Sequence, residues 1–482
     1  MSQEGLQRPL LRPYQLEALE IMSDNKHQCL FDDMGLGKTV TSLRHLERNT
    51  DPDTDRILII CPTNAIYVWK TEIEKWTDYK SLIYWGTQTE RARQLGEFIN
   101  PKRNYQYLIT STGVFAELLD FGWRHIICDE IHRWGLLNHK TKASGLLRRL
   151  KNKVDQTILL TGTPIRQGCI DLFSPLQITT KSDRTIGADT YWHFVNKWCI
   201  VNETPFGKQI DRRPKDLEAF RNMWRQYAVR RLTEEVKADL PEKRRAVVPV
   251  VMTAKQRKAH KDIMKELMHL EKESDSLIVA QNKMVAGLRA RQLLVSPRLL
   301  GIDEDGAALD YLKEVVPDYI YSDKPVVIFT PFRDAVSLIS DAIWEVCKGV
   351  VDIYTLHGQM TPAQFADNWM LFQKDALGKK KVLICTIQSG AAFHATEAAT
   401  CFFLGCEYDF NHNEQCEKRL HRLGQHEPVD CNYLLYEGDV IDQEVRDILN
   451  DKKRAATWIL SSEQQYAELL AQVKREQEHS RG

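Results

Sequence analysis

Short apolar runs alternate along the chain with longer stretches in which apolar residues recur at helical spacing. Polar residues, glycine or proline bound each run, which is typical of buried strands. Eight runs fit this description: RILIIC (56–61), YLIT (107–110), HIIC (125–128), TILLTG (157–162), VVIFT (326–330), VDIYTL (351–356), VLICT (382–386) and TCFFLG (400–405). This alternation predicts an α/β protein in which helices cover both faces of parallel sheets.

The alternating pattern occurs twice, before about residue 165 and after about residue 325, which predicts two parallel-sheet lobes with helical insertions between them. The region between is rich in Lys, Arg, Glu and Leu at helical spacing. ADLPEKRRA (238–246) combines a proline with several charges and predicts a linker. We expect a first lobe with a helical arm over 1–238, a linker and helical insertion over 239–300, a second lobe over 301–460 and a C-terminal helix over 461–482.

Composition narrows the class of protein. The 482 residues are 43% hydrophobic and 27% charged, which excludes wholesale disorder. No apolar run approaches the length of a membrane span, and the N-terminal MSQEGLQRPLLRPYQ is not typical of a signal peptide. The 11 cysteines include no C-x-x-C pair, which argues against a disulfide framework or a zinc site. We therefore expect a cytoplasmic protein.

The formal net charge is zero, because 66 Lys and Arg residues balance 66 Asp and Glu residues. Any binding of nucleic acid must then use local patches. One candidate is the stretch 211–245, in which eleven Lys and Arg residues outnumber seven Asp and Glu residues. The same stretch could instead make a contact between the lobes, and the alternative to both is a solvated helical face.

The strongest chemical signal is CLFDDMGLGKTVTSL (29–43), an apolar run that enters a glycine-rich turn and then a helical pattern. Gly35 and Gly37 would let backbone N–H groups turn inward around phosphate oxygens, and Lys38 would reach the β- and γ-phosphates. Thr39 would ligate Mg²⁺. The strict phosphate-loop pattern has glycine where this chain has Asp32, so an ordinary strand–helix turn is the alternative.

A second signal is HIICDEIH, in which a hydrophobic strand ends at Asp129 and Glu130. The first carboxylate could hold Mg²⁺ and the second could orient or deprotonate an attacking water. Such a pair alone is often an ordinary loop, and its place about 90 residues after a phosphate loop favours the catalytic interpretation.

Two further segments carry polar side chains at structurally informative places. LLTGTPI (159–165) ends a buried run on small hydroxyl residues, and any strand-to-loop transition would look similar. NEQCEKRLHRLGQ (413–425) places Arg419 and Arg422 three residues apart, on one helix face. An arginine that reaches the γ-phosphate stabilises transition-state charge, whereas the alternative is a solvated basic helix.

Taken in order, these motifs resemble superfamily 2 helicases, whose two RecA-like lobes bind ATP between them. LRPYQLEAL, DDMGLGKT, ICPTNAIYVWKTE, DEIH, LTGTPI, VVIFTPFRDAVSLI and QCEKRLHRLGQ resemble the SWI/SNF-type branch in particular. The stretch VRRLTEEVKADLPEKRRAVVPVVMTAKQRK is similar to the arm that leads into that branch's second lobe. The resemblance spans roughly residues 9 to 450.

The resemblance implies roles for individual residues. Arg12 and Gln15 match the adenine-side motif, and Gly35, Gly37, Lys38 and Thr39 match the phosphate loop. Asp129 and Glu130 match the Mg²⁺-binding and water-activating pair, with Thr39 as the second metal contact. Arg419 and Arg422 match the last motif, with Arg422 as the arginine finger. The residues implied to face the nucleic-acid backbone are Pro62, Thr63, Trp69, Thr110, Ser111 and Thr386.

One segment departs from the family pattern. SWI/SNF-type proteins carry a glycine-rich stretch where this chain has TIQSGAAFHA (386–395), with Gly390 as its only glycine. This version is similar to that of the HARP-like annealing helicases. The chain has no room for histone-reading extensions, which suggests a minimal motor of the kind that phages and bacteria carry.

The resemblance implies a DNA-dependent ATPase that uses ATP and Mg²⁺ to translocate along duplex or branched DNA without regard to sequence. Its output would be remodelling or branch migration. One alternative is a DExH-type RNA helicase, because such motors also act on RNA. Another is a nucleotide-gated scaffold that binds DNA without turnover.

Overall fold

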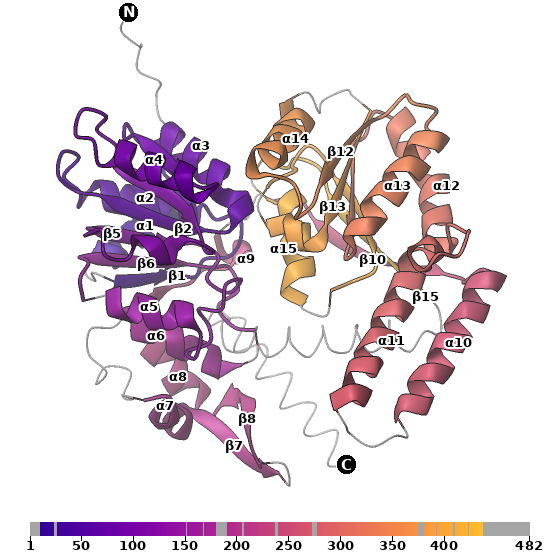
Figure 1. Ribbon diagram of the computed structural model, residues 1–482, viewed down its shortest axis with the longest axis horizontal. Coiled ribbons are helices and arrows are strands. Elements are labelled where there is room, and N and C mark those ends of the chain that lie inside the picture. Colours follow the sequence, from indigo (N-terminus) through magenta and orange to yellow (C-terminus); the bar gives the residue numbers. More distant parts are fainter. Residues whose placement is uncertain are drawn as a thin grey trace, which may run out of the picture. The chain divides into compact units, whose positions relative to one another are not determined.

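The computed structural model describes residues 10–23, 27–150, 152–166, 168–179, 190–204, 207–236, 240–271, 277–374, 380–391, 393–407, 410–422 and 424–436. The chain divides into two compact units, with the boundary between residues 238 and 239 (Figure 1). The predicted C-terminal helix over 461–482 lies outside the described residues.

A seven-stranded parallel sheet forms the centre of the first unit, in the order β3-β4-β2-β5-β6-β1-β9. Its strands are β1 (His27–Leu30), β2 (Ile57–Cys61), β3 (Ser81–Tyr84), β4 (Tyr107–Ser111), β5 (His125–Cys128), β6 (Gln156–Leu160) and β9 (Ala228–Val229). Because the strands are parallel, their carboxyl ends share one edge, where the loops after β1 and β5 meet.

Both faces of this sheet are buried, because alternate residues of each strand point in opposite directions. Ile57 and Ile59 pack in the apolar cluster that contains residues of α1, α2 and α3, whereas Leu58 and Ile60 pack in the cluster of α4, α5 and α6. These helices are α1 (Pro13–Ser23), α2 (Lys38–Glu47), α3 (Ile66–Trp76), α4 (Gln88–Phe98), α5 (Lys142–Leu150) and α6 (Phe173–Thr179).

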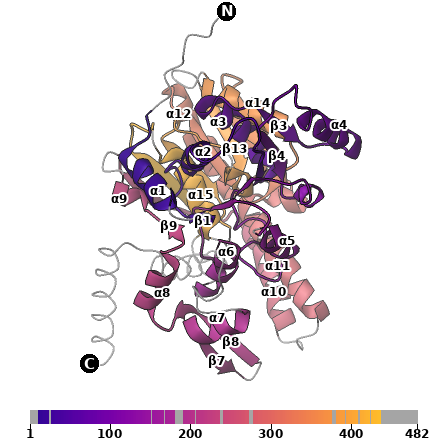
Figure 2. The ribbon, with the colours of Figure 1, turned by 90° about the vertical axis from the view of Figure 1, so that its left-hand side faces the viewer.

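A small projection extends from one end of the first unit (Figures 1 and 2). It contains α7 (Tyr191–Trp198), the antiparallel strands β7 (Cys199–Thr204) and β8 (Gly207–Pro214), and α8 (Leu217–Trp224). The chain then forms β9 and the short helix α9 (Thr233–Val236). Helical spacing had predicted helices in this region, and the β7–β8 hairpin is an addition that the sequence did not indicate.

The second unit is built on a six-stranded parallel sheet in the order β10-β15-β14-β11-β13-β12. Its strands are β10 (Lys243–Val250), β11 (Val326–Thr330), β12 (Asp352–Leu356), β13 (Lys381–Thr386), β14 (Thr400–Leu404) and β15 (Val429–Tyr436). Its helices are α10 (Ala254–Glu271), α11 (Leu277–Val295), α12 (Ala307–Tyr321), α13 (Arg333–Val346), α14 (Pro362–Lys374) and α15 (Phe410–Leu420).

The predicted fold class, two parallel-sheet α/β lobes with helical insertions, is confirmed, and each of the eight apolar runs contains a strand. The predicted linker is too long, because residues 243–246 belong to β10, the edge strand of the second sheet. α10 and α11 lie side by side in the second unit (Figure 1). Within the described part of the chain, no helix is long and apolar enough to cross a membrane.

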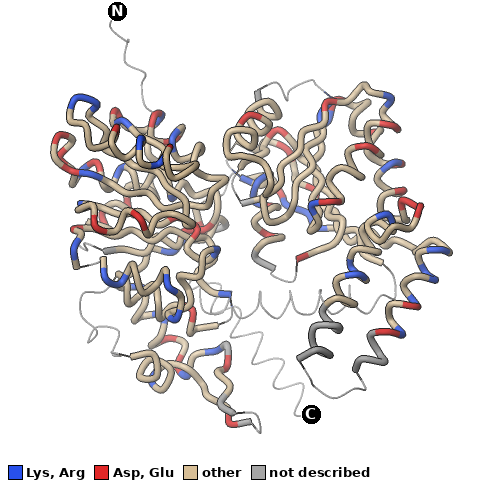
Figure 3. The backbone as a smooth tube through the Cα atoms, viewed as in Figure 1, with Lys and Arg blue, Asp and Glu red and all other residues tan. Residues whose placement is uncertain are grey.

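Lys and Arg positions are interspersed with Asp and Glu positions along the described backbone of each unit (Figure 3). This distribution agrees with the zero net charge of the sequence.

Candidate nucleotide site and arginine helix

The phosphate loop connects β1 to α2 at the carboxyl edge of the first sheet. Gly35 and Gly37 both have φ of +77°, a left-handed conformation that glycine adopts without a steric penalty. A Cβ atom on Gly37 would lie 2.4 Å from Gln15 Nε2, so a side chain here would displace the Gln15 amide from its hydrogen bond to Leu36. The loop therefore needs glycine for two separate reasons.

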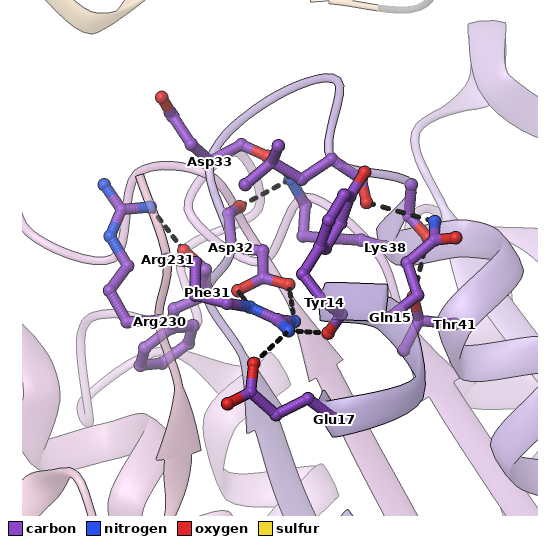
Figure 4. Close-up of polar contacts among 12 residues, drawn as sticks. Tyr14, Gln15, Glu17, Phe31, Asp32, Asp33, Lys38, Thr41, Arg230 and Arg231 are labelled. Carbon is purple, nitrogen blue, oxygen red and sulfur yellow. Dashed lines mark hydrogen bonds and ion pairs between the residues drawn. The ribbon is translucent and has the colours of Figure 1, made fainter. Parts of the chain in front are cut away.

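Lys38 is the first residue of α2, and its ammonium group points back into the loop. Its Nζ donates to the backbone oxygens of Asp32 and Asp33 at 2.9 and 3.2 Å (Figure 4). Burial lowers the pKa of Lys38, and the nearby carboxylates, of which Glu130 has the largest effect, oppose that shift. Lys38 thus lies among the carboxylates that the sequence assigned to the same site.

Gln15 links helix α1 to the phosphate loop. Its Nε2 donates to the Leu36 oxygen at 3.3 Å, while its Oε1 accepts from the Arg12 backbone N–H at 2.9 Å. The side chain of Gln15 is buried, whereas Arg12 is exposed.

Two consecutive arginines after β9 hold the loop from its other side. Arg231 forms a two-pronged ion pair with the buried carboxylate of Asp32 and donates to the Tyr14 backbone oxygen (Figure 4). Arg230 donates to the Phe31 oxygen and, at 3.3 Å, to the Gly162 oxygen. Asp32 stands where the strict pattern has glycine, and Arg231 neutralises it.

The carboxylate of Asp129 is held from two sides at the end of β5. Its Oδ2 accepts from the indole N–H of Trp69 at 2.8 Å, and its Oδ1 accepts from the Glu130 backbone N–H at 2.8 Å. Burial, together with the charge of Glu130, raises the pKa of Asp129 to about 7, although Trp69 and Lys38 act in the opposite direction. An added cation would favour the ionised form of this carboxyl group.

Glu130 follows in a left-handed conformation, with φ of +47°. A non-glycine residue in this region is strained, and such strain is concentrated at functional sites. Its Oε2 is buried and accepts no hydrogen bond among the described residues, and it lies 3.3 Å from His132 Nδ1. His132 Nδ1 also lies 2.8 Å from Thr161 Oγ1, which joins the DEIH and LTGTPI segments.

These residues fit a nucleotide phosphate and Mg²⁺. Lys38 now bonds to backbone oxygens that a phosphate oxygen could replace, and the buried Oε2 of Glu130 is available as an acceptor. Thr39, half-buried in the first turn of α2, and Asp129 supply the oxygen ligands that Mg²⁺ prefers.

The second unit carries the predicted arginines around the C-terminal end of α15. Arg419 is buried and its backbone oxygen accepts from Ala395 N–H at 2.9 Å. Arg422 follows the end of the helix and is half-buried. Gly390 packs against the same helix, since a Cβ atom there would lie 2.4 Å from Cys416 Sγ. The TIQSGAAFHA segment is therefore packed on the helix that carries the arginines.

The predicted DNA-contacting residues differ in their exposure. Trp69 is only 1% exposed and its indole donates to Asp129, so its side chain is unavailable to DNA in this structure. Thr110, Ser111 and Thr386 are also buried, which leaves their side chains unavailable to DNA in this structure. Pro62 and Thr63, at the end of β2, are partly exposed and stay candidates.

Sequence reasoning missed the loop-supporting roles of Arg230 and Arg231, which it counted only within a basic stretch. The available signal was Asp32 itself, because a carboxylate inside a phosphate loop needs a cationic partner. The sequence could not say which arginine serves, since Arg231 lies 199 positions away.

Comparison with known proteins gives a family match over more than half of the chain. The family described as "SNF2-related domain" matches residues 14–299. The chain is 24% identical over 490 residues to chromodomain-helicase-DNA-binding protein 8 of Danio rerio, covering 90% of this chain and 18% of that protein. It is 25% identical over 468 residues to ATP-dependent DNA helicase DDM1 of Arabidopsis thaliana, covering 87% of this chain and 58% of that protein.

The chain thus spans about a fifth of the length of the first of these relatives and somewhat over half of the second. Among solved structures, it is similar to the Sulfolobus solfataricus SWI2/SNF2 ATPase core in complex with dsDNA. That similarity has a TM-score of 0.42 and 22% sequence identity, and it covers 95% of this chain and 94% of the other.

Proposed function

This chain belongs to the SNF2-related family, and on that premise we propose that it is a DNA-dependent ATPase that translocates along duplex or branched DNA. The observation that carries the proposal is the position of Lys38. Its ammonium group lies in a glycine-rich loop beside the carboxylates of Asp129 and Glu130, the arrangement that phosphoryl transfer to water requires.

Each proposed site residue of the first unit has one task in this mechanism. Lys38 exchanges the oxygens of Asp32 and Asp33 for phosphate oxygens, and Gln15 supports the loop on the adenine side. Glu130 orients the attacking water and accepts its proton. Mg²⁺, held by Thr39 and Asp129, would neutralise charge that develops on the phosphates.

Arg419 and Arg422 of the second unit complete the proposed catalytic set, with Arg422 as the finger that stabilises transition-state charge. Guanidinium groups suit this task because they are always charged and offer several donors in one plane. Binding and hydrolysis would then change how the units engage each other, and the change would move the DNA.

DNA is proposed as the partner because the names of the relatives describe DNA-binding helicases. Contacts from backbone amides and hydroxyls to phosphates would be independent of sequence, as a motor requires. We further propose a bacterial or phage-type cytoplasmic motor with HARP-like features. The single glycine of TIQSGAAFHA supports the last point.

The test is ATP turnover by the full chain with no nucleic acid, single-stranded DNA, duplex DNA, forked DNA or RNA. The proposal predicts turnover that duplex or forked DNA stimulates more than single-stranded DNA or RNA does. Stimulation by RNA alone would indicate an RNA helicase. DNA binding without turnover under any condition would indicate a nucleotide-gated scaffold.

A further inference from the structure

Helix α15 carries a buried carboxylate two residues before Arg419. Glu417 has 0% of its surface exposed, and its two oxygens accept from four donor atoms. Lys243 Nζ donates at 3.0 Å, Arg245 Nε and Nη2 each donate at 2.6 Å, and the Tyr433 hydroxyl donates at 2.5 Å.

This cluster keeps Glu417 ionised although it is fully buried. Burial alone would favour the neutral acid, but Arg245, Lys243 and Tyr433 outweigh it and lower the pKa of Glu417 to about 2. A buried charge is strongly destabilising when one partner is removed. Because the Arg245 contact is two-pronged, it fixes the direction of the carboxylate as well as its charge.

Both cationic partners of Glu417 lie on β10, at the start of the second unit. Lys243 and Arg245 are alternate residues of β10, so they project from the same side of that strand. Arg244, between them, pairs instead with the exposed carboxylate of Asp430. β10 is the first described element after the boundary between the two units, and among the described strands it pairs only with β15.

α15 also contacts residues of the segment between β13 and β14. Cys416 packs against Gly390, and the Arg419 oxygen accepts from Ala395. The helix is therefore fixed between the 386–395 segment and the cluster formed by β10 and β15. A helix held in this way cannot rotate or slide without breaking the hydrogen bonds of Glu417.

We propose that Glu417 is a positioning residue that fixes α15 so that Arg419 and Arg422 are correctly placed for ATP hydrolysis. Lys243, Arg245 and Tyr433 are its anchors. Through them, the start of the second unit is mechanically joined to the arginine helix. The inference rests on the proposed ATPase function.

The test compares Tyr433→Phe and Glu417→Gln with the wild-type chain in DNA-stimulated ATP turnover. Both should lower kcat, Glu417→Gln by on the order of tenfold to a hundredfold, because small misplacements of a catalytic group have effects of that size. KM for ATP should stay within about twofold, since the phosphate loop is untouched. Tyr433→Phe keeps the ring that stacks on Phe403, 4.4 Å between centroids, and serves as the milder variant.

Asp430→Asn is the matched control, because it changes a residue of β15, the strand that carries Tyr433, and breaks a solvent-exposed pair with Arg244. It should leave kcat within about twofold of wild type. Arg245→Gln should lower kcat, and the double variant Arg245→Gln with Glu417→Gln should lose no more than the worse single variant, because both changes break one cluster.

The outcomes separate this inference from the proposed function. If the wild-type chain does not turn over ATP, the proposed function is wrong. If wild type turns over and both Tyr433→Phe and Glu417→Gln retain its kcat, the positioning role is wrong. A rise in KM for ATP with unchanged kcat also overturns it. Should Glu417→Gln not fold, a Tyr433→Phe variant with wild-type kcat is sufficient to reject the inference.

Discussion

At Glu130, both the backbone and the side chain are held in energetically unfavourable states. Its backbone is held at φ of +47°, and one carboxylate oxygen is buried and accepts no hydrogen bond among the described residues, although His132 Nδ1 lies 3.3 Å away. Each feature is unfavourable for folding, and the surrounding strand ends maintain both. A group held in this way is ready to accept a hydrogen bond from a water beside the γ-phosphate.

Replacing Glu130 by Gln should preserve ATP binding and lower kcat by about 10²–10⁴-fold, since an amide cannot accept the proton. Lys38→Ala should weaken binding and turnover together. Binding of a fluorescent ATP analogue and phosphate release would be measured on the same preparations. Glu74→Gln, an exposed carboxylate of α3, is the control and should behave as wild type. A Glu130→Gln variant with wild-type kcat would show that this carboxylate is not the base.

Asp32 and Arg231 form a buried ion pair, and the structure predicts how its removal changes stability. The Asp32 side chain is 1% exposed, so Arg231→Met would leave a buried carboxylate without its main partner. We expect a loss of about 3–5 kcal/mol in the free energy of unfolding, together with weaker ATP binding. Denaturant unfolding of the double variant Asp32→Asn with Arg231→Met should show a smaller loss. If the double variant loses as much as the sum of the single changes, the pair is not coupled.

The phosphate loop is the element in which backbone and side-chain requirements meet. Gly37→Ala would place a Cβ atom against Gln15 Nε2 in a left-handed conformation that costs about 1–2 kcal/mol. The variant should bind ATP more weakly, as measured by titration with the fluorescent analogue. Gly96→Ala, in the interior of α4 with open space around it, is the control and should stabilise the chain slightly. Unchanged ATP affinity in Gly37→Ala would contradict the described loop.

Two buried histidines, His45 on α2 and His125 on β5, should make the first unit sensitive to acid. Burial lowers the pKa of each to about 4, whereas an unfolded histidine has a pKa of about 6.5. Between these values the unfolded chain binds more protons, so stability rises with pH and is lost as pH falls from about 6.5 towards 4. Over this pH range, each ring should account for a loss on the order of 1–3 kcal/mol in the free energy of unfolding.

The measurement is the denaturant midpoint between about pH 5 and pH 7. The double variant His45→Gln with His125→Gln should show a flatter pH dependence than wild type. An equally steep dependence in that variant would assign the acid sensitivity to other groups.

At the level of elements, the sequence predicted mainly the strands that are buried on both faces of a sheet. Seven of the eight apolar runs became central strands, which bury nearly every side chain in a parallel sheet. The eighth became β12, an edge strand that is only partly buried. β10 was taken for a linker because it is an edge strand that begins with three charges and exposes most of its residues. The β7–β8 hairpin is mostly polar, so its spacing did not distinguish it from a helix.

In the candidate site, too, the sequence predicted the residues of local motifs and missed partners that are distant in the chain. Lys38, Asp129 and Glu130 were predicted because each lies in a local motif at the end of a strand. Trp69 was assigned to DNA because a motif does not reveal which face of α3 is buried. The cationic partners of Asp32 and Glu417 were not predicted, because each comes from more than 170 positions away in the chain.

For the whole molecule, the zero net charge means that the proposed DNA binding would depend on a limited set of contacts rather than on a general basic field. The two units each have their own sheet and core. Each unit could therefore keep its own fold through the cycle of nucleotide binding and release that we propose.

The most direct test of the account is displacement of a third DNA strand from a triplex by the full chain. Displacement reports translocation along a duplex and does not require strand separation. The account predicts displacement that depends on ATP and is abolished in Glu130→Gln, while Glu74→Gln displaces the strand as wild type does. ATP hydrolysis stimulated by duplex DNA with no displacement of the third strand would contradict the claim that this protein moves along DNA.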